Sequence, residues 1–160
     1  MTSQAITRAD VVAEARTWLA TPFHHQARLK GVGVDCAGLC IGVARALGLI
    51  DPAWDVHGYD RNPDGRTLMA ACLEQMDPTD QADMQPGDVL MVRFDTHPQH
   101  LGLLGDYRHG GLSIIHASGN EGRVIETRLM FSSAMLFVAA FRLRGLVAGA
   151  SAKVSAEVIS

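Results

Sequence analysis

The spacing of apolar residues changes about halfway along the chain. In the first half they recur about every three or four residues, which is typical of helices packed on one side. One such run follows Thr7 and stops before Thr21-Pro22, because a proline disfavours helical geometry in the residue before it. A second run begins at Cys36 and stops at Gly48, and a shorter one covers residues 67–76. We therefore expect three helices in the first half.

The second half begins with a turn signal, Pro86-Gly87, and then alternates short apolar runs with turn residues. We expect strands at residues 89–94, 100–104, 112–116, 123–127 and 135–142. Helices followed by a meander of strands indicate an α+β fold. The expected architecture is a set of N-terminal helices packed on a small antiparallel sheet of about five strands.

The last stretch of the chain has a different composition, because residues 146–160 are mostly Ala, Val, Ser and Gly. These residues lack the bulk to build a core of their own. We expect one domain over residues 1–145 and a C-terminal tail over residues 146–160. A length of 160 residues with 48% hydrophobic residues is enough for one such domain.

Charge and hydropathy exclude several classes of function. The net charge of −3 provides no basic surface for nucleic acid or for an anionic membrane. No apolar run approaches the roughly 18 residues of a membrane span. The N-terminus has no basic segment followed by an apolar run, so we expect no signal peptide and synthesis in the cytoplasm. Three cysteines are an odd number, which argues against a disulfide framework.

The candidate chemistry begins where a loop becomes the second helix. Asp35 is a good N-cap, so Cys36 should lie in the first helical turn. The positive end of a helix lowers the pKa of a cysteine from about 8.5 toward a reactive range. The Asp35 carboxylate opposes this effect, so a nucleophilic Cys36 also needs a histidine partner. His100, at the start of a strand, could form an ion pair with the thiolate.

A third polar group must orient the imidazole of His100, and His116 is the natural candidate. It lies on the next strand of a hairpin, and neighbouring antiparallel strands are about 5 Å apart. Side chains on the same face of these strands can therefore form a hydrogen bond. The backbone N–H of Cys36 could serve as one oxyanion donor.

The same residues also have simpler interpretations. An isolated cysteine at a helix start is more often a small buried residue, and a histidine at a strand start is more often on the surface. Cys36 and Cys40 could be metal ligands, but structural zinc sites favour cysteines about two to four residues apart on a tight turn. We expect no metal, and we expect Cys40 and Cys72 to be core residues.

The segment Val34-Asp35-Cys36-Ala37-Gly38-Leu39 resembles the nucleophile motif of the NlpC-type cysteine peptidases, which are papain-like bacterial and phage cell-wall endopeptidases. Further segments resemble the family in the same order along the chain: Thr21-Pro22-Phe23, Gln85 to Val89, His100 to Leu104, and Ile115-His116-Ala117. The resemblance implies a papain-like NlpC-type fold with Cys36 as nucleophile, His100 as base and His116 as orienting residue. It also implies no cofactor.

The implied substrate is bacterial peptidoglycan, cleaved in its peptide stems at the bond between γ-D-glutamate and a diamino acid. The family has a tyrosine where this chain has Phe23, and the hydroxyl of that tyrosine lies near the substrate amine. His24, His25 or Gln26 could replace it. The candidate substrate-binding or oxyanion residues are therefore Phe23, His25, Gln26 and Asp35.

Two segments, residues 18–26 and Phe141-Arg142, resemble small peptidases encoded among phage tail genes and in gene-transfer agents. This resemblance implies tail-tip or hub proteins as partners, and a virion or tail-particle component that acts in the periplasm or cell wall. Two alternatives remain open. One is a structural tail-tip component with the peptidase fold and little activity. The other is an amidase or transferase with the same Cys-His pair.

Overall fold

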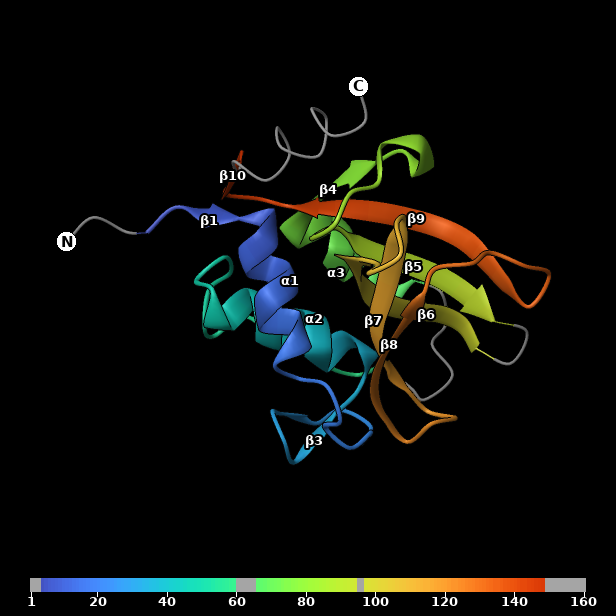
Figure 1. Cartoon of the computed structure of the whole chain (residues 1–160). Coiled ribbons are helices and arrows are strands. Elements are labelled where there is room, and N and C mark those ends of the chain that lie inside the picture. The colour runs from blue at the N-terminus through green and yellow to red at the C-terminus, as the bar shows by residue number, and fades with distance from the viewer. Residues whose placement is uncertain (1–3, 60–65, 95–96, 149–160) are drawn as a thin grey trace, which may run out of the picture.

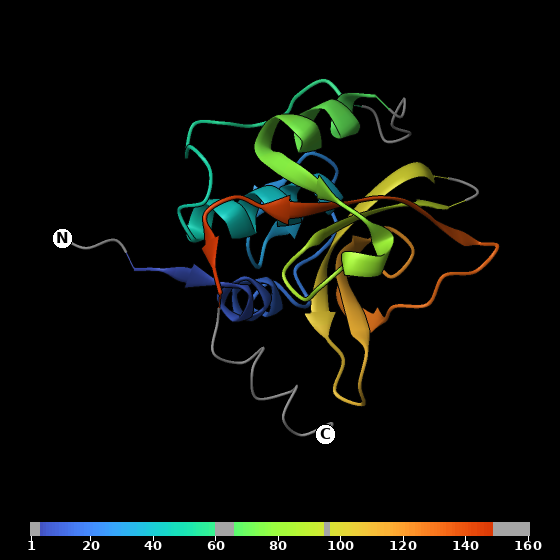
Figure 2. The same cartoon turned by 90° about the horizontal axis from the view of Figure 1, so that it is seen from above.

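Three helices lie on one face of a six-stranded antiparallel sheet in the computed structural model, which describes residues 4–59, 66–94 and 97–148 (Figures 1 and 2). The helices are α1 (Arg8–Arg16), α2 (Cys36–Ala46) and α3 (Thr67–Gln75). The strands of the sheet are β4 (Met76–Thr79), β5 (Val89–Phe94), β6 (His97–Asp106), β7 (Leu112–Ser118), β8 (Arg123–Arg128) and β9 (Met135–Leu143). Their order across the sheet is β4-β9-β5-β6-β7-β8. The expected α+β architecture is confirmed.

The sheet has one strand more than the five expected. The additional strand is β4, which pairs with β9 from Met76↔Leu143 to Thr79↔Ala140. Its sequence, Met-Asp-Pro-Thr, is short and contains a proline, and it has no apolar alternation that would predict a strand. Proline is tolerated at the edge of a sheet because an edge strand needs only half of its hydrogen bonds. The count of about five strands is therefore wrong by this edge strand.

Each face of the sheet has its own apolar core. On the helical face, buried side chains of α1 and α2 such as Val11 and Val43 pack with Leu103 and Phe141 of the sheet. On the opposite face, the buried residues are Leu90, Val92, Leu104 and Ile114. Successive residues of a strand point to opposite faces, so Leu101 and Leu103 of β6 face the helices and Leu104 faces away.

The turn before β5 attaches the sheet to α1. Asp88 is fully buried, and its Oδ1 accepts a hydrogen bond from Arg8 Nη1 at 2.6 Å. Gly87 has a φ of +91°, and a Cβ at this position would lie 3.2 Å from the Cα of Arg8. The Pro86-Gly87-Asp88 turn therefore has a structural role, because it brings the start of α1 against the sheet. A capping box of Thr7 and Asp10 lies at the same helix end.

The two ends of the described chain meet in a small parallel sheet. Strand β1 (Ile6–Thr7) pairs with β10 (Leu146–Val147), and Leu146 packs against the main core. The first residues of the expected tail therefore belong to the folded domain, so the boundary at residues 145/146 lies too early. Residues 149–160 of that tail lie outside the described residues. Within the described part of the chain, no helix has the length and apolar character needed to cross a bilayer.

Candidate active site

Cys36 is the first residue of α2, as the sequence predicts. The Asp35 side chain caps the helix, because its Oδ1 accepts a hydrogen bond from the Gly38 N–H at 2.8 Å. The backbone N–H groups of Ala37 and of Leu101 in β6 act on the Cys36 thiol and lower its pKa. Since Leu101 follows His100 directly, the thiol lies near the strand that carries the candidate base.

The resting state of the thiol differs from the expected one. Burial and, after it, the negative charge of Asp35 raise the pKa of Cys36 to about 11. The backbone hydrogen bonds and the charge of Arg28 lower this pKa by smaller amounts. The expected lowering at the helix N-terminus is therefore outweighed by loss of contact with water. Burial therefore favours the neutral thiol over the thiolate at Cys36.

The two candidate histidines are in direct contact. Nε2 of His100 lies 2.7 Å from Nδ1 of His116, and the rings meet edge to face with centroids 4.9 Å apart. Both side chains are largely buried, with 9% exposure each. Burial lowers the pKa of His116 to about 4, so this imidazole is neutral at ordinary pH. A neutral His116 can accept the Nε2 proton of His100 at Nδ1, which leaves Nδ1 of His100 as the basic nitrogen.

The sheet itself brings the two histidines together. The ladder between β6 and β7 runs from Asp106↔Leu112 to Leu103↔Ile115 and contains no pair beyond that point. His100 and His116 lie just past its end, on the same face of the sheet. Gly102 is essential to this approach, since a Cβ there would lie 2.7 Å from the side chain of Ile114. The ring of Phe94 on β5 flanks His100 at a centroid distance of 5.3 Å.

Asp35 is buried beside Cys36, with 2% exposure and both oxygens occupied. Besides the Gly38 N–H, it accepts hydrogen bonds from Arg28 Nη1 at 3.0 Å, from the Gln26 N–H at 2.7 Å and from the Tyr59 hydroxyl at 2.6 Å. The carboxylate therefore organises the loops around Cys36, and its oxygens are directed to protein donors.

The candidate residues that precede Cys36 lie in two different environments. Phe23 packs against the main core, and its N–H bonds the carbonyl of Gly122 at 2.8 Å. His25 and Gln26 lie next to Asp35 instead. His25 Nδ1 is 3.9 Å from Asp35 Oδ2, and Gln26 adopts a left-handed φ of +60° while its side chain bonds the Tyr59 carbonyl. The structure thus brings His25 and Gln26 to the site and turns Phe23 into the interior.

A tyrosine hydroxyl does reach this region, but from a segment that the motifs did not indicate. Tyr59 is 5% exposed and lies 24 residues after Asp35, in an irregular stretch between α2 and α3. No periodicity or motif marks it. Arg28, which bonds both Asp35 and the Tyr59 hydroxyl, was missed for the same reason.

The fold was compared with known proteins. No protein-family model and no curated protein sequence matches this chain. Solved structures do match: NlpC1 from Trichomonas vaginalis has 17% identity and a TM-score of 0.61, and the match covers 89% of this chain and 46% of that one. An NlpC/P60 family protein from Bacillus cereus has 18% identity and a TM-score of 0.63, with 88% and 41% covered. This chain therefore spans less than half the length of either protein.

A third neighbour is the peptidoglycan hydrolase RipB from Mycobacterium tuberculosis, with 19% identity and a TM-score of 0.54 over 85% of this chain and 64% of that one. Three independent neighbours agree. The chain has the NlpC/P60 fold. The resemblance noted from the sequence motifs is thereby confirmed at the level of the fold.

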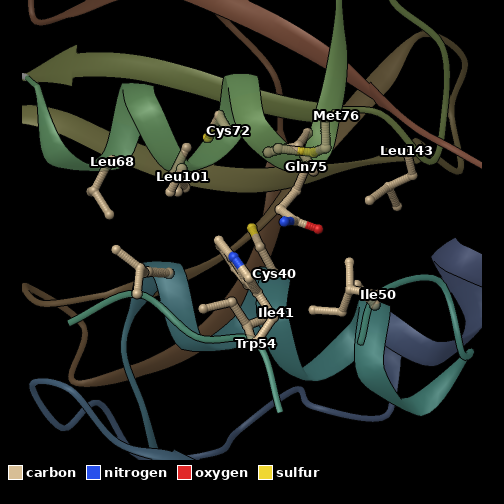
Figure 3. Close-up of a pocket in the computed structure, with 15 residues that line it drawn as sticks. Cys40, Ile41, Ile50, Trp54, Leu68, Cys72, Gln75, Met76, Leu101 and Leu143 are labelled. Carbon is tan, nitrogen blue, oxygen red and sulfur yellow. The ribbon is translucent and has the colours of Figure 1, made fainter. Parts of the chain in front are cut away.

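Within this NlpC/P60 fold, an apolar cavity of about 50 Å³ lies between α2 and α3, beginning at Ala37, the residue after Cys36 (Figure 3). Its walls include Cys40, Cys72, Trp54, Leu68 and Leu101. Cys40 and Cys72 are free thiols whose pKa values are raised by burial, that of Cys72 to about 12. Cys72 is a core residue, as expected, and Cys40 is partly buried and packs against the same core. Among the described residues, no group of three or more His, Cys, Asp or Glu is placed to hold a metal ion.

Proposed function

We propose that this chain is a cysteine peptidase that hydrolyses peptide stems of bacterial peptidoglycan. The observation that carries the proposal is the contact of His100 Nε2 with His116 Nδ1 at 2.7 Å, beside a cysteine at a helix N-terminus. A nucleophile, a base and an orienting group are the parts that thiol-dependent acyl transfer requires. The NlpC/P60 fold and the peptidoglycan hydrolase among its neighbours support the substrate class.

The reaction follows from the protonation states of the three groups. His100 takes the Cys36 proton at Nδ1 as the sulfur attacks the amide carbonyl, so the thiolate forms only during attack. The Cys36 N–H, in the first turn of α2, donates a hydrogen bond to the oxyanion in the proposed reaction. His100 then gives the proton to the leaving amine as the C–N bond breaks, which leaves a thioester on Cys36. Water, activated by His100, hydrolyses the thioester.

The finer parts of the proposal rest on sequence motifs. We propose the bond between γ-D-glutamate and a diamino acid as the scissile bond. We also propose delivery of the enzyme to the cell wall by a phage-like tail particle, with tail-tip or hub proteins as partners. Detection of the protein in purified particles, and its loss from particles that lack the tail tip, would test the second part.

The decisive experiment uses purified protein and soluble peptidoglycan fragments, with new amino groups and fragment masses as readouts. Wild type should release peptides, and Cys36→Ala and His100→Ala should release none. Cys40→Ala, one turn further along α2, and His109→Ala, in the exposed β6–β7 turn, are matched controls that should retain activity. Cleavage that survives Cys36→Ala would refute the proposed nucleophile, and the fragment masses would separate a peptidase from an amidase.

A binding protein that keeps the peptidase fold is the second candidate function. The raised pKa of Cys36 favours it, because a protonated thiol is a weak nucleophile until its base acts. If folded wild type releases no product from any fragment while it still binds peptidoglycan, this second candidate replaces the first.

A further inference from the structure

The most heavily bonded side chain near the nucleophile belongs to Arg28, in the short strand β2 (Arg28–Leu29), which pairs with β3 (Gly33–Val34). All three guanidinium nitrogens of Arg28 are engaged. Nη1 bonds Asp35 Oδ1 at 3.0 Å, Nε bonds Asp55 Oδ1 at 3.2 Å, and Nη2 bonds the Tyr59 hydroxyl at 2.7 Å. One planar group therefore joins Asp35 to Asp55 and Tyr59, which belong to a later segment of the chain.

Two of these partners lie on the irregular segment that follows α2. Asp55 also accepts a hydrogen bond from Arg45 of α2 at 3.2 Å, and Arg28 Nη2 lies 3.4 Å from the Val56 carbonyl oxygen. The Tyr59 carbonyl is held by Gln26 at 2.9 Å. Residues 55–59 therefore have no regular secondary structure but are fixed at several points, and most of those points are on Arg28 or its neighbours.

The third partner connects this segment to the reacting group. Asp35 caps α2 directly before Cys36, and the Tyr59 hydroxyl donates to its second oxygen at 2.6 Å. Arg28 also lies close against the first turn of α2, since a Cβ on Gly38 would be 2.9 Å from Arg28 Nη1. A shift of Arg28 must therefore move either the helix N-terminus or segment 55–59.

We propose that Arg28 is a positioning residue for the proposed peptidase reaction, which holds the N-terminus of α2 and residues 55–59 together as one wall of the substrate site. The inference rests on the proposed function. It assigns Arg28 two separable effects. Its planar fork fixes geometry, which a lysine ammonium cannot reproduce, and its charge offsets that of Asp35 beside the thiol.

The charge of Arg28 is one of several charges that act on the Cys36 thiol. The titratable and charged groups around the Cys36 thiol are Asp35, Arg28, Tyr59 and His25 on the loop side, Cys40 and Cys72 behind it, and His100 and His116 on the sheet. Asp35 raises the pKa of Cys36 and Arg28 lowers it. Removal of the positive charge should therefore make the thiol harder to ionise.

The test compares Arg28→Lys, Arg28→Met and Tyr59→Phe with an exposed control, Arg108→Met. Two readouts are used: steady-state kcat and KM on peptidoglycan fragments, and the rate of Cys36 alkylation by iodoacetamide from pH 7 to 11, measured by mass spectrometry. Arg28→Lys should keep the alkylation profile but lose about 10- to 100-fold in kcat, because the charge remains and the geometry does not. Arg28→Met should lose kcat as well, and its alkylation should be several-fold slower at each pH.

Tyr59→Phe keeps the ring and the guanidinium, and removes only the hydroxyl. It should lower kcat several-fold and slow alkylation, because Asp35 loses a donor beside the thiol. If both Arg28 variants have the kcat, KM and alkylation rate of wild type, the inference is overturned, even if their melting temperatures fall. If wild type hydrolyses no fragment, the proposed function fails, and an unchanged alkylation profile in Arg28→Met would then overturn the inference independently.

Discussion

The rings of His100 and His116 meet edge to face just beyond the end of the ladder between β6 and β7. Nε2 of His100 and Nδ1 of His116 are 2.7 Å apart, and the angle between the rings is 83°. His116 is too desolvated to become an imidazolium at neutral pH. In its Nε2–H tautomer it accepts the hydrogen bond at Nδ1, and His100 then keeps Nδ1 free as the basic nitrogen that a general base for Cys36 needs.

Replacement of His116 should lower turnover without abolishing it. His116→Ala leaves His100 without its partner, and we expect a loss of about 100-fold in kcat with little change in KM, because only the orientation of the base is affected. His116→Gln can still accept a hydrogen bond and should recover part of the loss. Steady-state kinetics on a soluble stem peptide measure both. Equal kcat values for the alanine and glutamine variants would contradict an orienting role.

The buried His116 should also make the domain less stable in mild acid. Its pKa is near 4 in the folded protein, below the value of about 6.5 in an unfolded chain, so the unfolded state binds the proton more readily. The stability is complete above pH 6.5 and falls between pH 6.5 and 4, by roughly 3 kcal/mol at most. Urea unfolding at several pH values measures this slope, and His116→Gln should flatten it.

Gly38 of the nucleophile motif should not tolerate a side chain. A Cβ there would collide with the Ala27 carbonyl oxygen and would come within 2.9 Å of Val34 Cγ2. We expect Gly38→Ala to cost about 2 kcal/mol or more, since overpacking moves backbone as well as side chains. Gly119→Ala is the matched control, because a Cβ at that position would have no atom of another part of the chain within 4 Å. Thermal melts that fall equally for both variants would refute this explanation of the motif glycine.

The buried Arg8–Asp88 pair should matter far more than an exposed pair of the same chemistry. Asp88→Ala leaves the Gln85 N–H without its acceptor and the Arg8 guanidinium with only the Pro86 carbonyl, and we expect a loss of about 3 kcal/mol. Arg144 and Asp77 form an exposed pair at 3.1 Å, so Asp77→Ala should cost less than about 1 kcal/mol. Chemical denaturation of the two variants gives the comparison directly.

Local patterns predicted most of the fold because its elements are amphipathic. The bounds expected for β5 are those observed, and α3 ends within one residue of its expected end. The features that were missed depend on distant partners. Strand β4 exists only because β9 runs beside it, and β1 and β10 are short strands that pair from opposite ends of the chain.

In the candidate site too, some features follow from local sequence signals and others depend on distant contacts. Cys36 and the His100–His116 contact follow from a cap residue and from the two-residue period of a strand, which are local signals. The pKa of Cys36 was expected to fall, because a sequence shows the helix end but not how deeply the thiol is buried. Arg28 and Tyr59 could not be found, since their contacts with Asp35 are fixed only when three loops fold together.

The parallel pairing of β1 with β10 brings both ends of the described chain to the same side of the domain. Both ends of the described chain leave there, and Gly145, just before β10, lies against Leu49, which follows the C-terminal end of α2 (Figure 1). Cys36 lies at the other end of the same helix. A label attached at β1 or β10 should therefore lie on the side of the domain away from Cys36.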